Sequence, residues 1–248
     1  MEFNGHPPIP GYEPIQLLGQ NGAIVYKARS DRFDKPVVLC VWTGHALPAS
    51  VNAVVGLEHP NILRVLDVGE VDGHAYCALE YLEGAESLGV RLRRGPVDEL
   101  GARRLTAAIA SVMQFVRERK MAVAPLTPGN VLLGETPKVR LCGLEGHDTH
   151  PDFMAPEELW KTPEPIAAAL DVYRVGALMY AMLTGRSPRS TNSEPSTGWY
   201  LESPPLAVRR INPAISKTLE SICMKCVEEN PRDRYQSLTE LIDLVKTR

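Results

Sequence analysis

Two cysteines near the end of the chain have a spacing that could support metal or redox chemistry. Cys223 and Cys226 form a C-x-x-C pair, and such a pair can bind zinc or cycle between dithiol and disulfide. A structural zinc site needs four ligands, and no second Cys or His pair lies at a suitable spacing. Residues 221–227 also have the pattern of an amphipathic helix, in which positions i and i+3 share a face. We therefore interpret both cysteines as core residues, with a zinc or redox site as the alternative.

A second group combines imidazole and carboxylate side chains, which are common metal ligands. His147, Asp148, His150 and Asp152 lie within residues 146–153. Alternating polar residues in a loop are more often hydrated than bound to a metal, because a metal site also needs a fixed geometry. We expect no metal site in this chain.

The elements that must position these residues change in character along the chain. In the first eighty residues, short β-branched runs are separated by turn residues, and Asp72-Gly73 lies between two of them as in a β-hairpin. The expected strands are Ala23–Ala28, Pro36–Trp42, Val65–Val71 and Ala75–Glu80, with one helix over Leu47–Leu57. After Gly84 the apolar residues recur with the period of a helix. The expected helices are Leu100–Arg119, Leu170–Leu183, Ser216–Glu228 and Ser237–Lys246, with an irregular segment over residues 185–213.

This order of elements predicts an α+β fold with a small strand-rich lobe followed by a larger helical lobe. A cleft between two such lobes is the usual place for a ligand. The 248 residues are 44% hydrophobic and 23% charged, which is ordinary for a globular chain. The 27 basic and 30 acidic residues give a net charge of −3, so no basic field exists to attract nucleic acid. The run Arg91–Arg94 is interpreted as a solvated helix face.

The expected location is the cytoplasm, with a cytosolic domain of a larger protein as the alternative. No stretch reaches the roughly 20 apolar residues that a membrane helix needs, so we expect no membrane insertion. The first residues lack the basic and apolar regions of a signal peptide. Five cysteines in a chain of this length do not indicate a disulfide framework.

Five short motifs, in one order, resemble those of a protein kinase domain of the bacterial serine/threonine type. His59–Ile62 resembles the turn after the family's regulatory helix, and Glu80–Gly84 resembles the hinge between lobes. Met154–Glu157 is similar to the A-P-E element. Asp171–Gly176 resembles the start of the buried helix of the large lobe, and Asn230–Arg234 resembles the loop whose last arginine pairs with the A-P-E glutamate.

The resemblance covers about Gly11 to Val245 and implies one kinase-like domain over residues 1–248. Residues 11–82 would form the N-terminal lobe and residues 83–248 the C-terminal lobe. In this family a strand lysine holds the phosphates and a helix glutamate holds that lysine. An aspartate accepts the substrate proton, and an aspartate and an asparagine hold magnesium.

Most of these chemical positions are replaced in this chain. The replacements are Cys40 for the strand lysine, Ser50 for the helix glutamate, Pro125 for the proton-accepting aspartate, Thr127 for the helper lysine and Gly143 for the magnesium-binding aspartate. Asn130 is retained. Glu145 lies two positions after Gly143, which is too far along the chain to replace the metal ligand. Lys27 is interpreted as a surface lysine rather than a displaced catalytic one.

The remaining cleft positions also argue against a nucleotide. The remnant of the phosphate loop keeps Gly19 and Gly22 but lacks the last glycine, and a Cβ keeps phosphates away from backbone amides. The resemblance assigns the adenine side to Val25, Val38, Leu79 and Leu132, with Val38 in place of the usual alanine. We expect ATP and magnesium binding to be absent or weak.

Two sets of positions retain or gain a structural role. Four side chains are expected to form an apolar stack, and two of their positions belong to former catalytic motifs. They are Val54, Leu66, Val123 and Leu144. Glu157 and Arg234 are expected to form a buried ion pair, and Asp171 is expected to hold the backbone around Val123–Ala124.

These observations predict a catalytically inactive kinase homologue, a pseudokinase, that binds a protein partner as a scaffold or regulatory module. One alternative is an atypical kinase with displaced catalytic residues. Another is a sensor that binds a small molecule or nucleotide in the cleft without chemistry.

Overall fold

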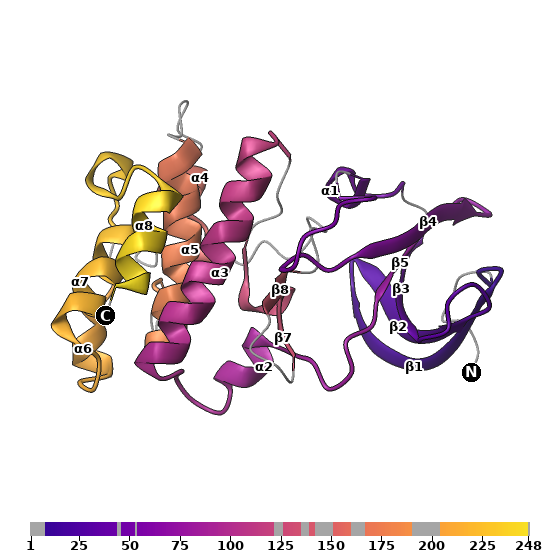
Figure 1. Cartoon of the computed structure of the whole chain (residues 1–248), viewed down its shortest axis with the longest axis horizontal. Coiled ribbons are helices and arrows are strands. Elements are labelled where there is room, and N and C mark those ends of the chain that lie inside the picture. The colour runs from indigo at the N-terminus through magenta and orange to yellow at the C-terminus, as the bar shows by residue number, and fades with distance from the viewer. Residues whose placement is uncertain are drawn as a thin grey trace.

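The computed structural model of the chain describes residues 8–43, 46–52, 54–121, 126–134, 139–141, 151–159, 167–189 and 204–247. A sheet-rich N-terminal lobe lies beside a mainly helical C-terminal lobe (Figure 1). This is the α+β, bilobal arrangement that the sequence predicts.

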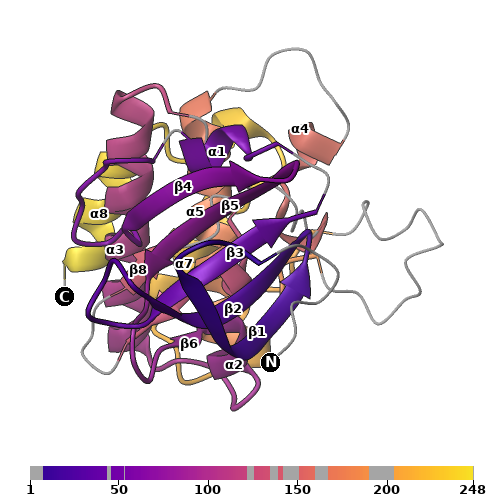
Figure 2. The ribbon, with the colours of Figure 1, turned by 90° about the vertical axis from the view of Figure 1, so that its right-hand side faces the viewer.

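The N-terminal lobe is a five-stranded antiparallel sheet in the order β1-β2-β3-β5-β4, which faces the viewer in Figure 2. Its strands are β1 Tyr12–Asn21, β2 Ala23–Ser30, β3 Val37–Trp42, β4 Val65–Val71 and β5 His74–Glu80. The predicted hairpin at Asp72-Gly73 is confirmed, because these residues have φ of 50° and 75° between β4 and β5. Positive φ at both central residues matches the twist of the two strands.

The helix expected over Leu47–Leu57 is much shorter than predicted. The α1 helix spans Ala49–Asn52, and Val55 already forms a parallel bridge with Val65. Gly56 then has a φ of 74°, which is incompatible with a helix. The segment contains valines, whose χ1 torsion is restricted, and a glycine, and both residue types are weak helix formers. Tertiary pairing with β4 therefore determines the conformation of this segment.

The two lobes are joined by backbone pairing as well as by the chain itself. After α1, Leu63 donates its N–H to the carbonyl of Leu141 at 2.9 Å, and Leu141 donates to Asn61 at 2.9 Å. The Asn61 side chain adds a bond to the Val139 carbonyl at 2.7 Å. The His59 ring packs 4.5 Å from that of Phe115, and its burial lowers its pKa. The motif His59–Ile62 therefore anchors the N-terminal lobe to the C-terminal one.

Within its described residues, the C-terminal lobe contains four long helices, and each begins or ends close to its predicted bounds. They are α3 Glu99–Glu118, α5 Ala167–Thr184, α7 Lys217–Cys226 and α8 Leu238–Lys246. Asp98, Ser216 and Ser237 cap α3, α7 and α8 by accepting backbone N–H groups. Shorter helices are α2 Leu88–Leu92, α4 Pro156–Leu159 and α6 Val208–Ile211, of which α6 lies in the segment expected to be irregular.

A small sheet has the strand order β6-β7-β8, and its strands β7 and β8 lie between the N-terminal lobe and the long helices of the C-terminal lobe (Figure 1). Its strands are β6 Glu86–Ser87, β7 Val131–Leu133 and β8 Val139–Leu141, and 3-10 turns cover Pro128–Asn130, Pro151–Phe153 and Pro231–Asp233. One hydrophobic cluster runs from β3 through this sheet to α8. In the described residues, no helix is long and apolar enough to cross a membrane.

The C-x-x-C pair lies inside this hydrophobic cluster, as predicted. Cys223 and Cys226 on α7 are both fully buried, and burial raises the pKa of both thiols. Cys226 packs against Gly176 of α5 so closely that a Cβ on the glycine would lie 2.3 Å from the Cβ of Cys226. The small side chain of Cys226 therefore serves helix packing.

Candidate functional site

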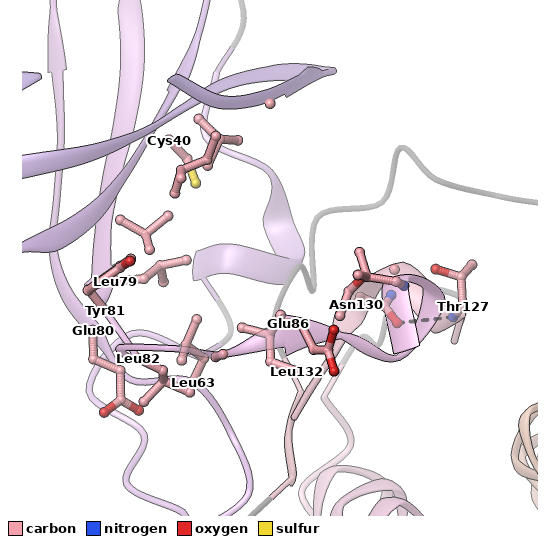
Figure 3. Close-up of a pocket in the computed structure, with 18 of the residues that line it drawn as sticks. Cys40, Leu63, Leu79, Glu80, Tyr81, Leu82, Glu86, Thr127, Asn130 and Leu132 are labelled. Atoms are coloured by element: carbon pink, nitrogen blue, oxygen red, sulfur yellow. Dashed lines mark hydrogen bonds between the residues drawn. The ribbon is translucent and has the colours of Figure 1, made fainter. Parts of the chain in front are cut away.

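A cavity of about 550 Å³ lies between the lobes, at the position expected for a ligand (Figure 3). Strands β1 to β3 form its roof, the segment that leaves β5 forms its back, and β6, β7 and the turn before β7 form its floor. All four residues assigned to the adenine side line it: Val25, Val38, Leu79 and Leu132. The cavity volume falls within the range of about 300–1,000 Å³ typical of ligand pockets.

Cys40 occupies the roof of the cavity, where the resemblance implies a lysine. It lies in β3 opposite Val25 of β2 and Cys77 of β5, and it is 2% exposed. Figure 3 shows its sulfur pointing down toward the cavity. A thiol is too short to reach a phosphate held at the floor and carries no positive charge.

The remnant of the phosphate loop is a tight hairpin. Strands β1 and β2 pair up to Asn21 opposite Ala23, so Gly22 alone, with a φ of 67°, connects them. Gly19 and Gln20 line the cavity from within β1. Because the strand pairing extends to the tip, no glycine-rich loop is left to wrap a phosphate with its amides.

Lys27 is not the exposed surface lysine that the sequence predicts. Its side chain is only 19% exposed, and its ammonium lies 4.2 Å from the centre of the Tyr81 ring and 3.6 Å from a Glu83 oxygen. The hydrogen bond to Tyr81 and the charge of Glu83 raise the pKa of Lys27. The sequence reasoning missed these contacts because Tyr81 and Glu83 belong to the hinge, 54 or more positions further along the chain.

The floor of the cavity contains Thr127 and Asn130, which lie in and beside the 3-10 turn before β7. The Asn130 side-chain oxygen accepts the Thr127 backbone N–H at 3.0 Å, so the retained asparagine shapes this turn. Thr127 is 3% exposed, and its side chain and that of Asn130 form a reciprocal capping box at the start of this turn. Sequence reasoning treated Thr127 only as a lost lysine and did not identify this capping role.

Several predicted positions lie outside the described residues. These are Val123, Ala124, Pro125, Gly143, Leu144, Glu145, His147, Asp148 and His150. Ser50 lies in α1. Asp152, the described member of the His/Asp group, accepts a hydrogen bond from Ser187 at 2.9 Å.

The expected apolar stack is wrong at Leu66. A β-bulge between Val65 and Asp67 displaces Leu66 to the other side of the sheet, where it packs in a separate cluster with residues such as Ile9 and Tyr12. Val65, 7% exposed, shares the main cluster with Val54 instead. A bulge reverses the alternation of side chains along a strand, and the sequence alone does not locate it.

The ion pair predicted between Glu157 and Arg234 is present and bidentate. The two Arg234 terminal nitrogens donate to the two Glu157 oxygens at 2.6 and 2.8 Å, and both side chains are at most 5% exposed. Arg234 also donates to the carbonyls of Glu228, Glu229 and Ala169. All five guanidinium N–H groups are therefore used.

Asp171 is buried, but its observed partner is a residue that the sequence reasoning did not name. Arg117 of α3 donates from Nε to an Asp171 oxygen at 2.5 Å, and burial raises the pKa of Asp171 against the influence of this arginine. The predicted contact with Val123–Ala124 lies outside the described residues. Two residues on helices far apart in sequence carry no local signal of their pairing.

Comparisons with known proteins agree with this geometry. Residues 45–243 match the family described as protein kinase domain. The chain is 24% identical over 259 residues to serine/threonine-protein kinase PrkC of Bacillus subtilis (strain 168), which covers 95% of this chain and 40% of PrkC. It is also 24% identical over 267 residues to serine/threonine-protein kinase PknB of Mycobacterium tuberculosis (strain ATCC 25618 / H37Rv), covering 95% of this chain and 42% of PknB. The chain thus spans about two fifths of the length of these curated relatives.

Proposed function

The chain belongs to the protein kinase domain family. Within this family, we propose that it is a catalytically inactive member, a pseudokinase. Its role would be that of a protein-interaction, scaffold or regulatory module. The relatives named above are kinases, but conserved fold does not imply conserved chemistry, which depends on particular residues at the site.

The observation that carries this proposal is the charge of the cleft. Phosphoryl transfer depends on cations that neutralise the phosphates and stabilise the charge of the transition state. The described residues that line the cavity include no lysine or arginine, and Cys40 lies where the family has its lysine. Pro125 and Gly143, at the positions of the two aspartates, add a sequence argument of the same kind.

The competing hypothesis is an active kinase with displaced residues, and it would need another cation near the phosphates. Lys27 is the candidate in β2, the strand next to Cys40. Its ammonium is held over Tyr81 and beside Glu83, and it does not line the cavity. These contacts support the proposal of an inactive protein over the hypothesis of an active kinase. The proposal also includes a protein partner and a cytoplasmic location.

ATP with magnesium, at millimolar concentration, is expected to leave the melting temperature unchanged within the error of the assay. The reason is that a ligand stabilises the fold only if it binds the native state, and the described residues that line the cleft offer no lysine or arginine to a triphosphate. Differential scanning fluorimetry measures the shift. A saturable increase with ATP and magnesium would contradict the proposal.

The matched variant is Cys40→Lys, which restores the strand lysine alone. It is expected to show no phosphoryl transfer, because Pro125 and Gly143 still occupy the positions of the proton acceptor and the metal ligand. Detectable turnover by this variant would show that one replaced residue, rather than the whole site, limits activity.

A further inference from the structure

We propose that Cys40 and Cys77 form a redox-modification site, at which a peroxide converts the two thiols into a reversible disulfide across the roof of the cleft. The reaction uses neither ATP nor a catalytic motif, so it goes beyond the proposed function and does not depend on it. Disulfides in cytoplasmic proteins are usually transient and serve catalysis or redox sensing. The inference gives a chemistry to the cysteine at the position of the family's lysine.

The two cysteines face each other on adjacent strands. Cys40 of β3 lies directly opposite Cys77 of β5 in the antiparallel register, and both are thiols in this structure. Directly opposed side chains project from the same face of a sheet. The packing agrees, because both cysteines belong to the cluster that continues into the C-terminal lobe, whereas their chain neighbours Leu39 and Ala78 pack in the cluster on the other face. The two thiols therefore lie side by side on the face toward the cleft.

The strand geometry brings the pair within the reach of a disulfide. Glu80 donates its backbone N–H to the Arg64 carbonyl, toward β4, so the backbone groups of Cys77, three positions earlier, point toward β3. Residues opposed in such a hydrogen-bonded pair have Cα atoms about 5.5 Å apart, within the range of about 4.4–6.8 Å that disulfides span. Their Cβ atoms lie about 4.5–5.5 Å apart, whereas a disulfide holds them at about 3.5–4.5 Å. The bond can therefore form if the strands close by about 1 Å, and the resulting strain makes it easy to reduce.

The cavity gives an oxidant access to one member of the pair. The Cys40 sulfur points into the cavity of about 550 Å³, although the residue as a whole is buried (Figure 3). Hydrogen peroxide is little larger than a water molecule and fits this space. Cys77 is fully buried and does not line the cavity. Cys40 is therefore the residue that the oxidant meets first, and Cys77 is the resolving thiol beside it.

The cysteine pair on α7 lacks these features. Cys223 and Cys226 lie on one helix, both are fully buried, and neither lines the cavity. Burial raises the pKa of both thiols, which disfavours the thiolate that reacts with oxidants. The chain thus provides an internal control for an effect of access through the cavity.

The reaction balances with hydrogen peroxide as the oxidant. The Cys40 thiolate attacks one peroxide oxygen, the O–O bond breaks, Cys40 becomes a sulfenic acid, and the leaving hydroxide takes up the proton lost by the thiol. The Cys77 sulfur then attacks the Cys40 sulfur, the S–O bond breaks, and hydroxide leaves as water with the Cys77 proton. Two thiols and one peroxide give one disulfide and two waters, and two electrons pass from sulfur to peroxide. A thiol reductant such as glutathione reverses the reaction by thiol–disulfide exchange.

The first test maps the disulfide in the wild-type chain. The reduced chain is treated with hydrogen peroxide, remaining thiols are blocked with N-ethylmaleimide, and the protein is digested with trypsin without reduction. Arg64 lies between Cys40 and Cys77, so cleavage there leaves the two cysteines in peptides that only a disulfide can join. We expect mass spectrometry to find these linked peptides after peroxide treatment, and to find them separated again after incubation with reduced glutathione.

Three outcomes of this mapping would overturn the assignment. The first is the absence of linked peptides after peroxide treatment. The second is a link from Cys40 to Cys142, which lies outside the described residues, or to Cys40 of a second chain. The third is oxidation of Cys223 to the same extent as Cys40, which would show that oxidation follows unfolding rather than access through the cavity. We expect Cys223 and Cys226 to be recovered as maleimide adducts.

The second test separates the roles of the two thiols. Cys77→Ser removes the resolving thiol, so peroxide should leave Cys40 as a sulfenic acid that dimedone labels several-fold more than in the wild type. Cys40→Ser should leave Cys77 unlabelled, because the cavity reaches only Cys40. Equal labelling of Cys40 in the wild type and in Cys77→Ser would overturn the resolving role of Cys77. Circular dichroism checks the fold, and Cys77→Ala replaces the serine variant if a hydroxyl at this buried position unfolds the sheet.

These outcomes are distinguishable from those that test the proposed function. A chain that forms the disulfide and also transfers phosphate would overturn only the proposed function. A chain that does neither would overturn only the redox site.

Discussion

Glu157→Ala is expected to lower the free energy of unfolding by about 3–5 kcal/mol, because it strands a buried guanidinium without its partner. Arg234 is fully buried and uses all its N–H groups, two of them on Glu157. The pair connects α4 to the loop before α8, and the Arg234 guanidinium also lies 4.7 Å from the Tyr173 ring of α5. Removal of the carboxylate therefore destabilises three elements at once.

Urea unfolding of Glu157→Ala, Arg234→Ala and the double variant measures this effect. The double variant is expected to lose much less than the sum of the single ones, because neither charge is then left unpaired. The exposed pair of Arg29 and Glu13, at 2.9 Å, is the control. Glu13→Ala should cost less than about 1 kcal/mol. An equal loss in Glu157→Ala and Glu13→Ala would contradict a structural role for the buried pair.

Gly176→Ala is expected to cost about 3 kcal/mol, because α5 and α7 approach too closely to admit a methyl group. The added Cβ would lie 2.3 Å from the Cβ of Cys226 and 3.3 Å from a Val227 methyl carbon. Overpacking of this kind exceeds the gain of up to about 1 kcal/mol that alanine brings to a helix. The two helices must separate to accommodate it.

Gly89→Ala in α2 is the matched control for this second large effect. Its added Cβ meets no atom closer than 3.6 Å, which is ordinary contact, so the variant is expected to be neutral or slightly stabilising. Thermal unfolding of both variants compares the costs. A Gly176→Ala variant as stable as Gly89→Ala would show that α5 and α7 move apart without cost.

Periodicity predicted the helices that contribute one apolar face to the core. Leu100–Arg119 was expected as a helix and α3 spans Glu99–Glu118, and the Ser237 cap is present at the start of α8. Periodicity failed at α1 and at Leu66, where pairing with β4 and a bulge override the local pattern. Local propensity is informative only where tertiary contacts agree with it.

The sequence predicted which residues line the site, but not which contacts their side chains make. The motif order places Cys40 at the end of the cleft that would hold phosphates, and the lining of the cavity agrees with the adenine-side positions. The partner of Lys27 and the partner of Asp171 depend on contacts between distant segments. No short sequence pattern encodes such contacts.

The most direct test of the central claim is transfer of a radiolabelled γ-phosphate from ATP to the chain itself or to basic-protein and peptide substrates. The assay includes magnesium and manganese, with a kinase of the bacterial serine/threonine type as the positive control. Because the described lining of the cleft contains no lysine or arginine and the motifs lack both aspartates, we predict incorporation no higher than the no-enzyme background. Incorporation that rises with chain concentration and is lost in Asn130→Ala would contradict an inactive site.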